Sequence, residues 1–131
     1  MPDLDRIVRS YNEACSSGSL ADVTAFFTDD AVIYDLNHAP VVGREAIGRF
    51  WGHVRGKWGG AHWSTDSVIA QGQRAAAEWT MSGVAGGLAF TFRGVDIFHV
   101  NDDGLLCEVR QYWRFDPTDL TSGLVGFDYD D

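Results

Sequence analysis

The chain has 131 residues, 45% hydrophobic and 13% aromatic, which is enough for one domain with a real core and unlike a disordered segment. A net charge of −9 disfavours nucleic acids and anionic membrane surfaces as partners, because like charges repel. Neither a basic leader nor an apolar run of about 20 residues is present, which predicts a soluble, cytoplasmic protein that does not span a membrane.

The first half of the chain has the apolar spacing of helices. The first predicted helix carries a stripe of apolar side chains: Leu4, Ile7, Val8, Tyr11 and Cys15. Gly18 ends this helix. Two further helices, over residues 20–27 and 44–56, are separated by a strand at 31–36 and a loop at 37–40. The pattern indicates three helices with a single strand among them.

The second half alternates as strands do. Four strands are predicted, at residues 63–70, 75–82, 90–100 and 107–115. Gly, Asn and Asp residues between them are typical of turns. The layout favours an α+β fold in which three helices pack on a strongly curved, mostly antiparallel sheet. Residues 1–116 form the predicted domain, and 117–131 an acidic tail.

Asp96 lies on a face where a carboxylate is costly. In the strand 90–100, side chains alternate, so Asp96 shares a face with Phe92 and Phe98. A carboxylate on such an apolar face must be hydrogen-bonded, paired or protonated. Acids in that position are candidates for chemistry.

Two more polar groups lie on apolar faces. Tyr11 belongs to the stripe of the first helix, and Asp35 shares a strand face with Ala31 and Ile33. Helices that cover a sheet bring these faces together around one interior. We therefore expect an apolar pocket that holds two carboxyls and a phenol. The predicted frame of this pocket is Phe98, Trp113 and Phe115, with Trp51 on the third helix and His38 in the loop above it.

From Leu4 to about Phe115 the chain resembles the cone-shaped superfamily of nuclear transport factor 2, ketosteroid isomerases and SnoaL-type polyketide cyclases. The resemblance is strongest to the ketosteroid isomerases. Tyr11, seven residues before Gly18, falls where these enzymes place an oxyanion-hole tyrosine. Asp35, at the end of Ala31-Val32-Ile33-Tyr34-Asp35, matches their general base. Asp96, in Gly94-Val95-Asp96-Ile97-Phe98, matches the acid that stays protonated, and Trp113 matches a tryptophan of the steroid pocket.

The resemblance implies an enzyme that moves a proton next to a carbonyl on an apolar cyclic ketone or polyketide-like substrate. Asp35 would shuttle the proton, while Tyr11 and a neutral Asp96 hold the oxyanion. No cofactor is implied, and a homodimer is expected by analogy. Leu36 departs from the proline that often follows the isomerase base, and the Trp- and Gly-rich segment 56–63 has no isomerase counterpart.

Other interpretations remain. A SnoaL-like cyclase with the same acid–base logic is one alternative, although the last strand presents Gln111 inward where such a cyclase needs an acid. A non-catalytic small-molecule binding protein is another, with Tyr11 as a core residue, Asp35 as a solvated strand end and Asp96 as a structural hydrogen-bonding group.

Histidines and cysteines do not have the spacing of a metal site. We interpret Cys15 and Cys107 as core thiols rather than a disulfide. The tryptophans are interpreted as core and pocket wall, since an acidic protein is a poor platform for stacked nucleic-acid bases. They are Trp51, Trp58, Trp63, Trp79 and Trp113.

Overall fold

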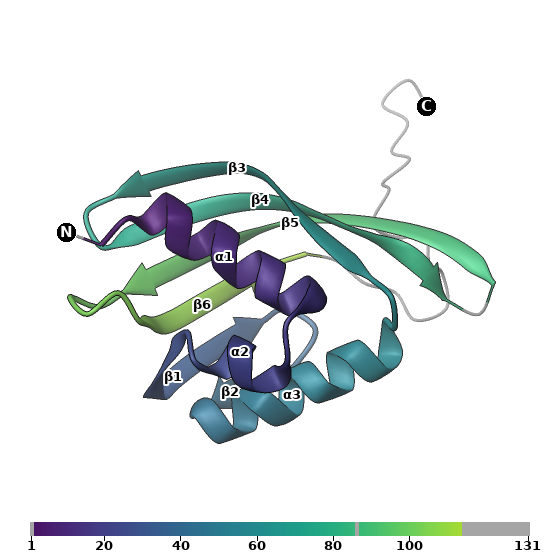
Figure 1. Cartoon of the computed structure of the whole chain (residues 1–131), viewed down its shortest axis with the longest axis horizontal. Coiled ribbons are helices and arrows are strands. Elements are labelled where there is room, and N and C mark those ends of the chain that lie inside the picture. The colour runs from purple at the N-terminus through teal and green to yellow at the C-terminus, as the bar shows by residue number, and fades with distance from the viewer. Residues whose placement is uncertain (1, 86, 114–131) are drawn as a thin grey trace.

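A computed structural model describes residues 2–85 and 87–113 (Figure 1). The helices are α1 (Leu4–Ser17), α2 (Leu20–Thr24) and α3 (Arg44–Lys57). The strands are β1 (Phe27–Asp35), β2 (Val41–Val42), β3 (His62–Gln71), β4 (Arg74–Ala85), β5 (Leu88–Val100) and β6 (Leu106–Tyr112). Phe115 and the predicted tail 117–131 lie outside the described residues.

Local sequence explains the boundaries of the first helices. The Asp3 side chain accepts a hydrogen bond from the Arg6 amide at 3.2 Å and caps α1, and the predicted apolar stripe of this helix is buried. A capping box between Ser19 and Asp22 begins α2. The prediction that α2 reaches Phe27 is wrong. Phe27 instead begins β1, where its fully buried ring pairs with the strand that contains Leu106.

The strands form one six-stranded sheet in the order β2-β1-β6-β5-β4-β3. All neighbours are antiparallel except β1 and β6, which run parallel. The predicted meander accounts for β3 to β6, whereas the two-residue β2 was not predicted. Because β6 returns beside β1, the first and last strands of the described residues become neighbours within the sheet.

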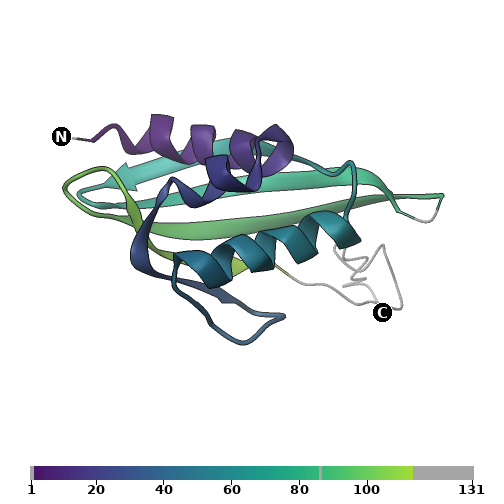
Figure 2. The same ribbon diagram turned by 60° about the horizontal axis from the view of Figure 1, so that its bottom comes forward.

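The helices lie over one face of the curved sheet, as the two views in Figures 1 and 2 show. Register shifts in β3 (between Thr65 and Ser67) and near the end of β5 (between His99 and Val100) mark β-bulges, which bend strands. The second shift corrects one expectation. Cys107 is half-buried rather than in the core, because the extra residue at the bulge turns Leu106 inward instead.

Cys15 is buried as expected, and both cysteines are free thiols. Burial raises the pKa of the Cys15 thiol, so this side chain remains protonated and unreactive.

One side chain joins the two long helices. Arg55, on α3, donates through Nη2 to the carbonyl oxygens of Ala14 at 2.6 Å and Cys15 at 3.0 Å, and through Nη1 to that of Gly18. These carbonyls belong to the C-terminal end of α1, where the helix dipole favours a cation. Arg55 therefore sets the position of α1, which carries Tyr11, relative to α3.

Replacing Arg55 with methionine should lower the free energy of unfolding by about 2–4 kcal/mol, because three carbonyls in a partly buried position lose a charged donor. Urea denaturation measures this value. The control is Arg49→Met on the same helix, where the exposed side chain pairs only with Glu45. Equal stabilities of the two variants would show that Arg55 does not join the helices.

Candidate active site

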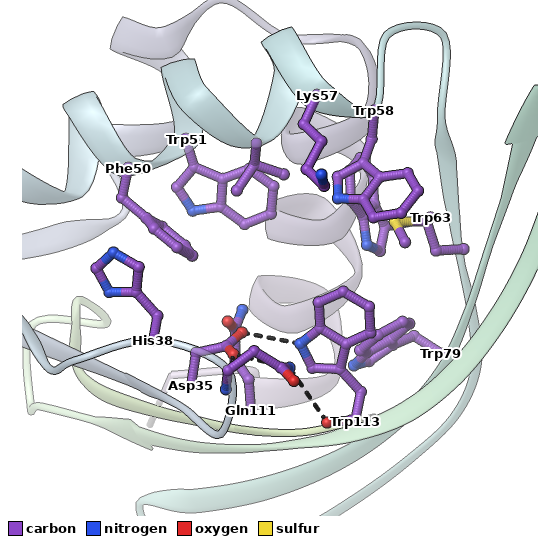
Figure 3. A pocket seen from close by; sticks show the side chains of 13 residues that line it. Asp35, His38, Phe50, Trp51, Lys57, Trp58, Trp63, Trp79, Gln111 and Trp113 are labelled. Atoms are coloured by element: carbon purple, nitrogen blue, oxygen red, sulfur yellow. Dashed lines mark hydrogen bonds between the residues drawn. The ribbon is translucent and has the colours of Figure 1, made fainter. Parts of the chain in front are cut away.

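A pocket opens between α3 and the sheet, with a cavity volume of about 160 Å³ (Figure 3). Its wall is mainly aromatic and contains every tryptophan of the chain, which confirms their interpretation as pocket wall. The lining residues are Asp35, Asn37, His38, Phe50, Trp51, Val54, Lys57, Trp58, Trp63, Trp79, Met81, Gln111 and Trp113. Such a wall favours an apolar ligand, with few polar groups to orient it.

Three polar side chains form a row across the sheet beside this pocket. In the sheet register, Gln111 of β6 is the partner of Asp35 on one side and of Asp96 on the other. Neighbouring strands are about 4.8 Å apart, so the two acids lie on the same face with their backbones about 10 Å apart. The inward orientation predicted for Asp96 and Gln111 is confirmed, since they are only 4% and 8% exposed.

Asp35 is held at the edge of the pocket by nitrogen donors. The Trp113 indole donates to Oδ2 at 2.8 Å, while the Asn37 amide N–H donates to Oδ1 at 2.7 Å and the Asn37 side chain at 3.1 Å. Figure 3 shows this carboxyl facing the cavity beneath Trp51. Three N–H donors suit an ionised carboxylate, and the half-buried position leaves it accessible to a ligand.

Asp96 has the opposite environment. Burial raises the pKa of this carboxyl to about 7, against the lowering effect of the 2.9 Å hydrogen bond from the Trp79 indole. The negative charge of Asp35 raises this pKa further, and a hydrogen bond with Gln111 lowers it. The carboxyl of Asp96 is thus biased toward its protonated form.

Glycine at position 94 makes room for the indoles that contact these acids. A Cβ on Gly94 would lie 2.5 Å from Cζ2 of Trp79 and 2.9 Å from Cβ of Trp113. Both tryptophans could not keep their positions beside a larger residue. Gly94 therefore contributes to the site by the absence of a side chain.

The Tyr11 hydroxyl is buried without a hydrogen-bond partner among the described residues. Its ring packs edge-on against Phe27, Phe98 and Trp51. Burial raises the pKa of Tyr11 well above its usual value, and the N–H of Trp51 offsets part of that rise. The Trp51 indole nitrogen is also buried and lacks a partner of hydrogen-bonding geometry. Buried donors without an acceptor are uncommon and suit a ligand oxygen.

The structure brings most of the predicted site residues to one region but in different layers. Asp35, His38, Trp51 and Trp113 line the cavity. Tyr11 and Asp96 lie directly behind the lining, at 1% and 4% exposure, and their roles stay predictions. Phe98 is a fully buried core residue that packs on Tyr11 and does not line the cavity.

Sequence reasoning did not include several lining residues in the site, notably Asn37 and Lys57, and it gave Trp79 only the general role of core or pocket wall. The alternation of β4 places Trp79 on the same face as Ala77 and Met81, which would have indicated an inward indole. Lys57 had no such pattern, because it is the last residue of a helix and reaches the cavity from the rim.

Over residues 2–85 and 87–113, no group of three or more His, Cys, Asp or Glu side chains is placed to hold a metal ion. Within those same ranges, every helix is too short or too polar to cross a bilayer.

Comparison with known proteins places the fold and this site in context. The model of the SnoaL-like domain family matches residues 8–109. The chain belongs to the SnoaL-like family. The predicted resemblance to the NTF2-like superfamily is therefore confirmed, and with it the α+β architecture of a mixed sheet and three helices.

Relatives of this SnoaL-like protein include enzymes. Steroid Delta-isomerase of Nocardioides simplex is 30% identical over 116 residues, which cover 86% of this chain and 89% of that protein. A hypothetical protein of Catenulispora acidiphila with a ketosteroid isomerase-like fold, solved with trimethylamine, has a TM-score of 0.78 at 15% identity, covering 89% of this chain and 90% of its own. SalBIII, an epoxide hydrolase/cyclase-like enzyme of pyran ring formation in the polyether salinomycin, has a TM-score of 0.77 at 17% identity. The match covers 86% of this chain and 91% of SalBIII. At these identities, the two structures establish the fold alone.

The buried acid predicts a pH-dependent stability. The folded-state pKa of Asp96 is about 7, above its ordinary value of 3.8, so the native state binds a proton between these pH values that the unfolded chain does not. The contribution of this group to stability is therefore lost as the pH rises from about 4 through about 7, by up to about 4 kcal/mol.

Asp96→Asn removes that titration, so the variant should gain stability relative to wild type between about pH 5 and about pH 8. Urea denaturation at both pH values measures the difference, with Asp103→Asn on an exposed loop as the control. A difference between variant and wild type that is the same at both pH values would contradict the prediction.

Proposed function

We propose that this protein is a ketosteroid-isomerase-like enzyme that moves a double bond into conjugation with a ketone on an apolar ring system. The observation that carries the proposal is the row in which Asp35 and Asp96 flank Gln111, with one acid hydrogen-bonded at the pocket edge and the other buried at a raised pKa. Paired acids in contrasting environments are the arrangement that separates a base from a proton donor.

Asp35 is the proposed base. Its carboxylate removes a proton from the carbon next to the carbonyl, and the electron pair of that C–H bond forms a dienolate whose negative charge lies on the oxygen. The same carboxyl then delivers the proton to the far end of the dienolate. The hydrogen bonds from Trp113 and Asn37 orient the carboxylate for both transfers without burying it.

The dienolate oxygen requires donors in a dry environment. Tyr11 keeps its proton because burial raises its pKa, and a protonated Asp96 adds a second O–H. Trp51 lines the cavity, and its buried indole N–H has no acceptor of hydrogen-bonding geometry among the described residues. Tyr11 and Trp51 lie behind or in the same wall, so a ketone oxygen that enters this wall would meet donors that have no acceptor of their own among the described residues.

Similarity to the steroid isomerase of Nocardioides simplex supports the proposed substrate class, and the aromatic wall supports an apolar ring. A SnoaL-like cyclase would use the same proton chemistry on another substrate. Gln111 between the two acids disfavours that alternative, because an amide cannot act as an additional acid or base.

Replacing the proposed base gives the first test. Asp35→Asn should lower kcat by about 10²–10⁴-fold on a β,γ-unsaturated ketosteroid, because the amide cannot accept the proton. The absorbance of the conjugated product reports turnover. Asp103→Asn controls for the loss of one negative charge. Retained activity in Asp35→Asn would exclude Asp35 as the base, and tight binding of a phenolic steroid without turnover in wild type would identify a binding protein instead.

The raised pKa of Asp96 predicts a pH profile. Because the neutral carboxyl is the donor, wild-type kcat should fall as the pH rises through about 7. Asp96→Asn keeps an N–H donor that does not titrate, so its kcat should be lower at acidic pH but lack this fall. Steady-state kinetics from about pH 5 to about pH 9 provide the measurement. A fall of the same size in both proteins would remove Asp96 from the oxyanion site.

A further inference from the structure

A second hollow lies next to the pocket. Its volume is about 480 Å³, and it shares part of its lining with the inner pocket. The shared residues are His38, Phe50, Val54, Lys57 and Trp58. The outer hollow alone adds Pro40, Val41, Val42, Ala46, Arg49 and His53. We call this hollow the outer groove. A ligand can therefore extend from one hollow into the other.

Among the described residues, the charged lining of the outer groove is basic. Arg49, His53 and Lys57 lie four residues apart along α3, which places them on one side of the helix. Over residues 2–85 and 87–113, no Asp or Glu lines the groove, although the protein carries a net charge of −9. Glu45 pairs with Arg49 at 3.3 Å, but both side chains are exposed and Glu45 is not in the lining. Such an exposed pair leaves Arg49 available to a stronger anionic partner.

The inner pocket is small compared with a substrate that has several rings. About 160 Å³ is close to the space that holds one benzene-sized ring. A substrate with several rings, placed with its reacting ring beside Asp35, must therefore continue past Lys57 into the outer groove. Lys57 lines both hollows and lies with Nζ 5.5 Å from the centre of the Trp58 ring. The row of basic side chains, Arg49, His53 and Lys57, therefore begins at the edge of the aromatic wall of the inner pocket.

We propose that the outer groove binds a carboxylate at the far end of the substrate, so that the substrate class is an amphipathic keto acid. The apolar rings occupy the inner pocket, and the carboxylate lies beside Arg49, His53 and Lys57. This inference rests on the proposed function for the orientation of the substrate. Exposed ion pairs are individually weak, so the carboxylate should raise kcat/KM by about 3–30-fold over an uncharged equivalent.

The first experiment compares a β,γ-unsaturated ketosteroid that carries a carboxylate opposite its ketone with the methyl ester of the same acid. Wild type should prefer the acid, and the preference should shrink as salt is raised from about 0.05 M to about 0.5 M, because exposed charges are screened. The double variant Arg49→Gln/Lys57→Gln should lose most of the preference. Equal kcat/KM for acid and ester in wild type would overturn the inference.

Arg9→Gln is the matched control. Arg9 also forms an exposed ion pair with a residue four positions away, Asp5, but it is on α1 and lines neither hollow. The control makes the same change in net charge as each single substitution. It should keep the full preference for the acid, and an equal loss in Arg9→Gln would overturn the inference by showing a general effect of charge.

Binding of the conjugated products separates this inference from the proposed function. The product acid and its methyl ester bind without turnover, and quenching of the pocket tryptophans reports their affinities. Tighter binding of the acid that depends on Arg49 and Lys57 supports the outer groove even if no isomerisation occurs, in which case only the proposed function fails. Equal binding of acid and ester, or no binding of either, overturns the outer groove even if a neutral ketosteroid is isomerised.

Discussion

The parallel pairing of β1 with β6 is the constraint on which the site depends. It places the end of the first strand beside a strand that is already paired with β5, so that Gln111 connects Asp35 to Asp96 across the sheet. Without this register, the two acids would be separate features of distant segments. With it, they share one face of the sheet, and the charge of Asp35 contributes to the raised pKa of Asp96.

Each of these acids accepts a hydrogen bond from an indole, and the two acids differ in how deeply they are buried. Trp113 donates to Asp35 at the pocket edge, and Trp79 donates to Asp96 in the interior. Each indole provides one N–H on a large apolar body, so it can hydrogen-bond a carboxyl and exclude water from it together. Because both rings occupy space that a side chain at Gly94 would fill, the glycine and the two tryptophans form one packing unit.

Helix α3 supplies residues to both the inner pocket and the outer groove. Trp51 and Val54 of α3 line the inner cavity, while Arg49 and His53 line the outer groove. Arg55, on the side toward α1, fastens this helix to the carbonyls at the end of α1. The contact between α1 and α3 therefore couples the positions of Tyr11, the aromatic wall and the outer groove.

Much of the fold was predictable because its patterns are local. The stripe of α1 and the alternation of β5 identified their buried faces, including the unusual inward acid at Asp96. Chain order alone did not show where α2 ends, which depends on burial of Phe27 against Leu106, or the bulge that turns Cys107 away from the core. Both depend on contacts between segments that are separate in sequence but adjacent in space.

For this protein, alternation and helical spacing by themselves determined which faces are apolar and which polar residues interrupt them, since side-chain direction follows from backbone geometry. Tertiary structure alone decided the depth of each polar group: Asp35 and Trp51 at the cavity, Tyr11 and Asp96 behind its wall, and Phe98 in the core. It also decided that Arg49, His53 and Lys57 border an apolar pocket. Depth and adjacency depend on how separate elements pack, and no local pattern records that packing.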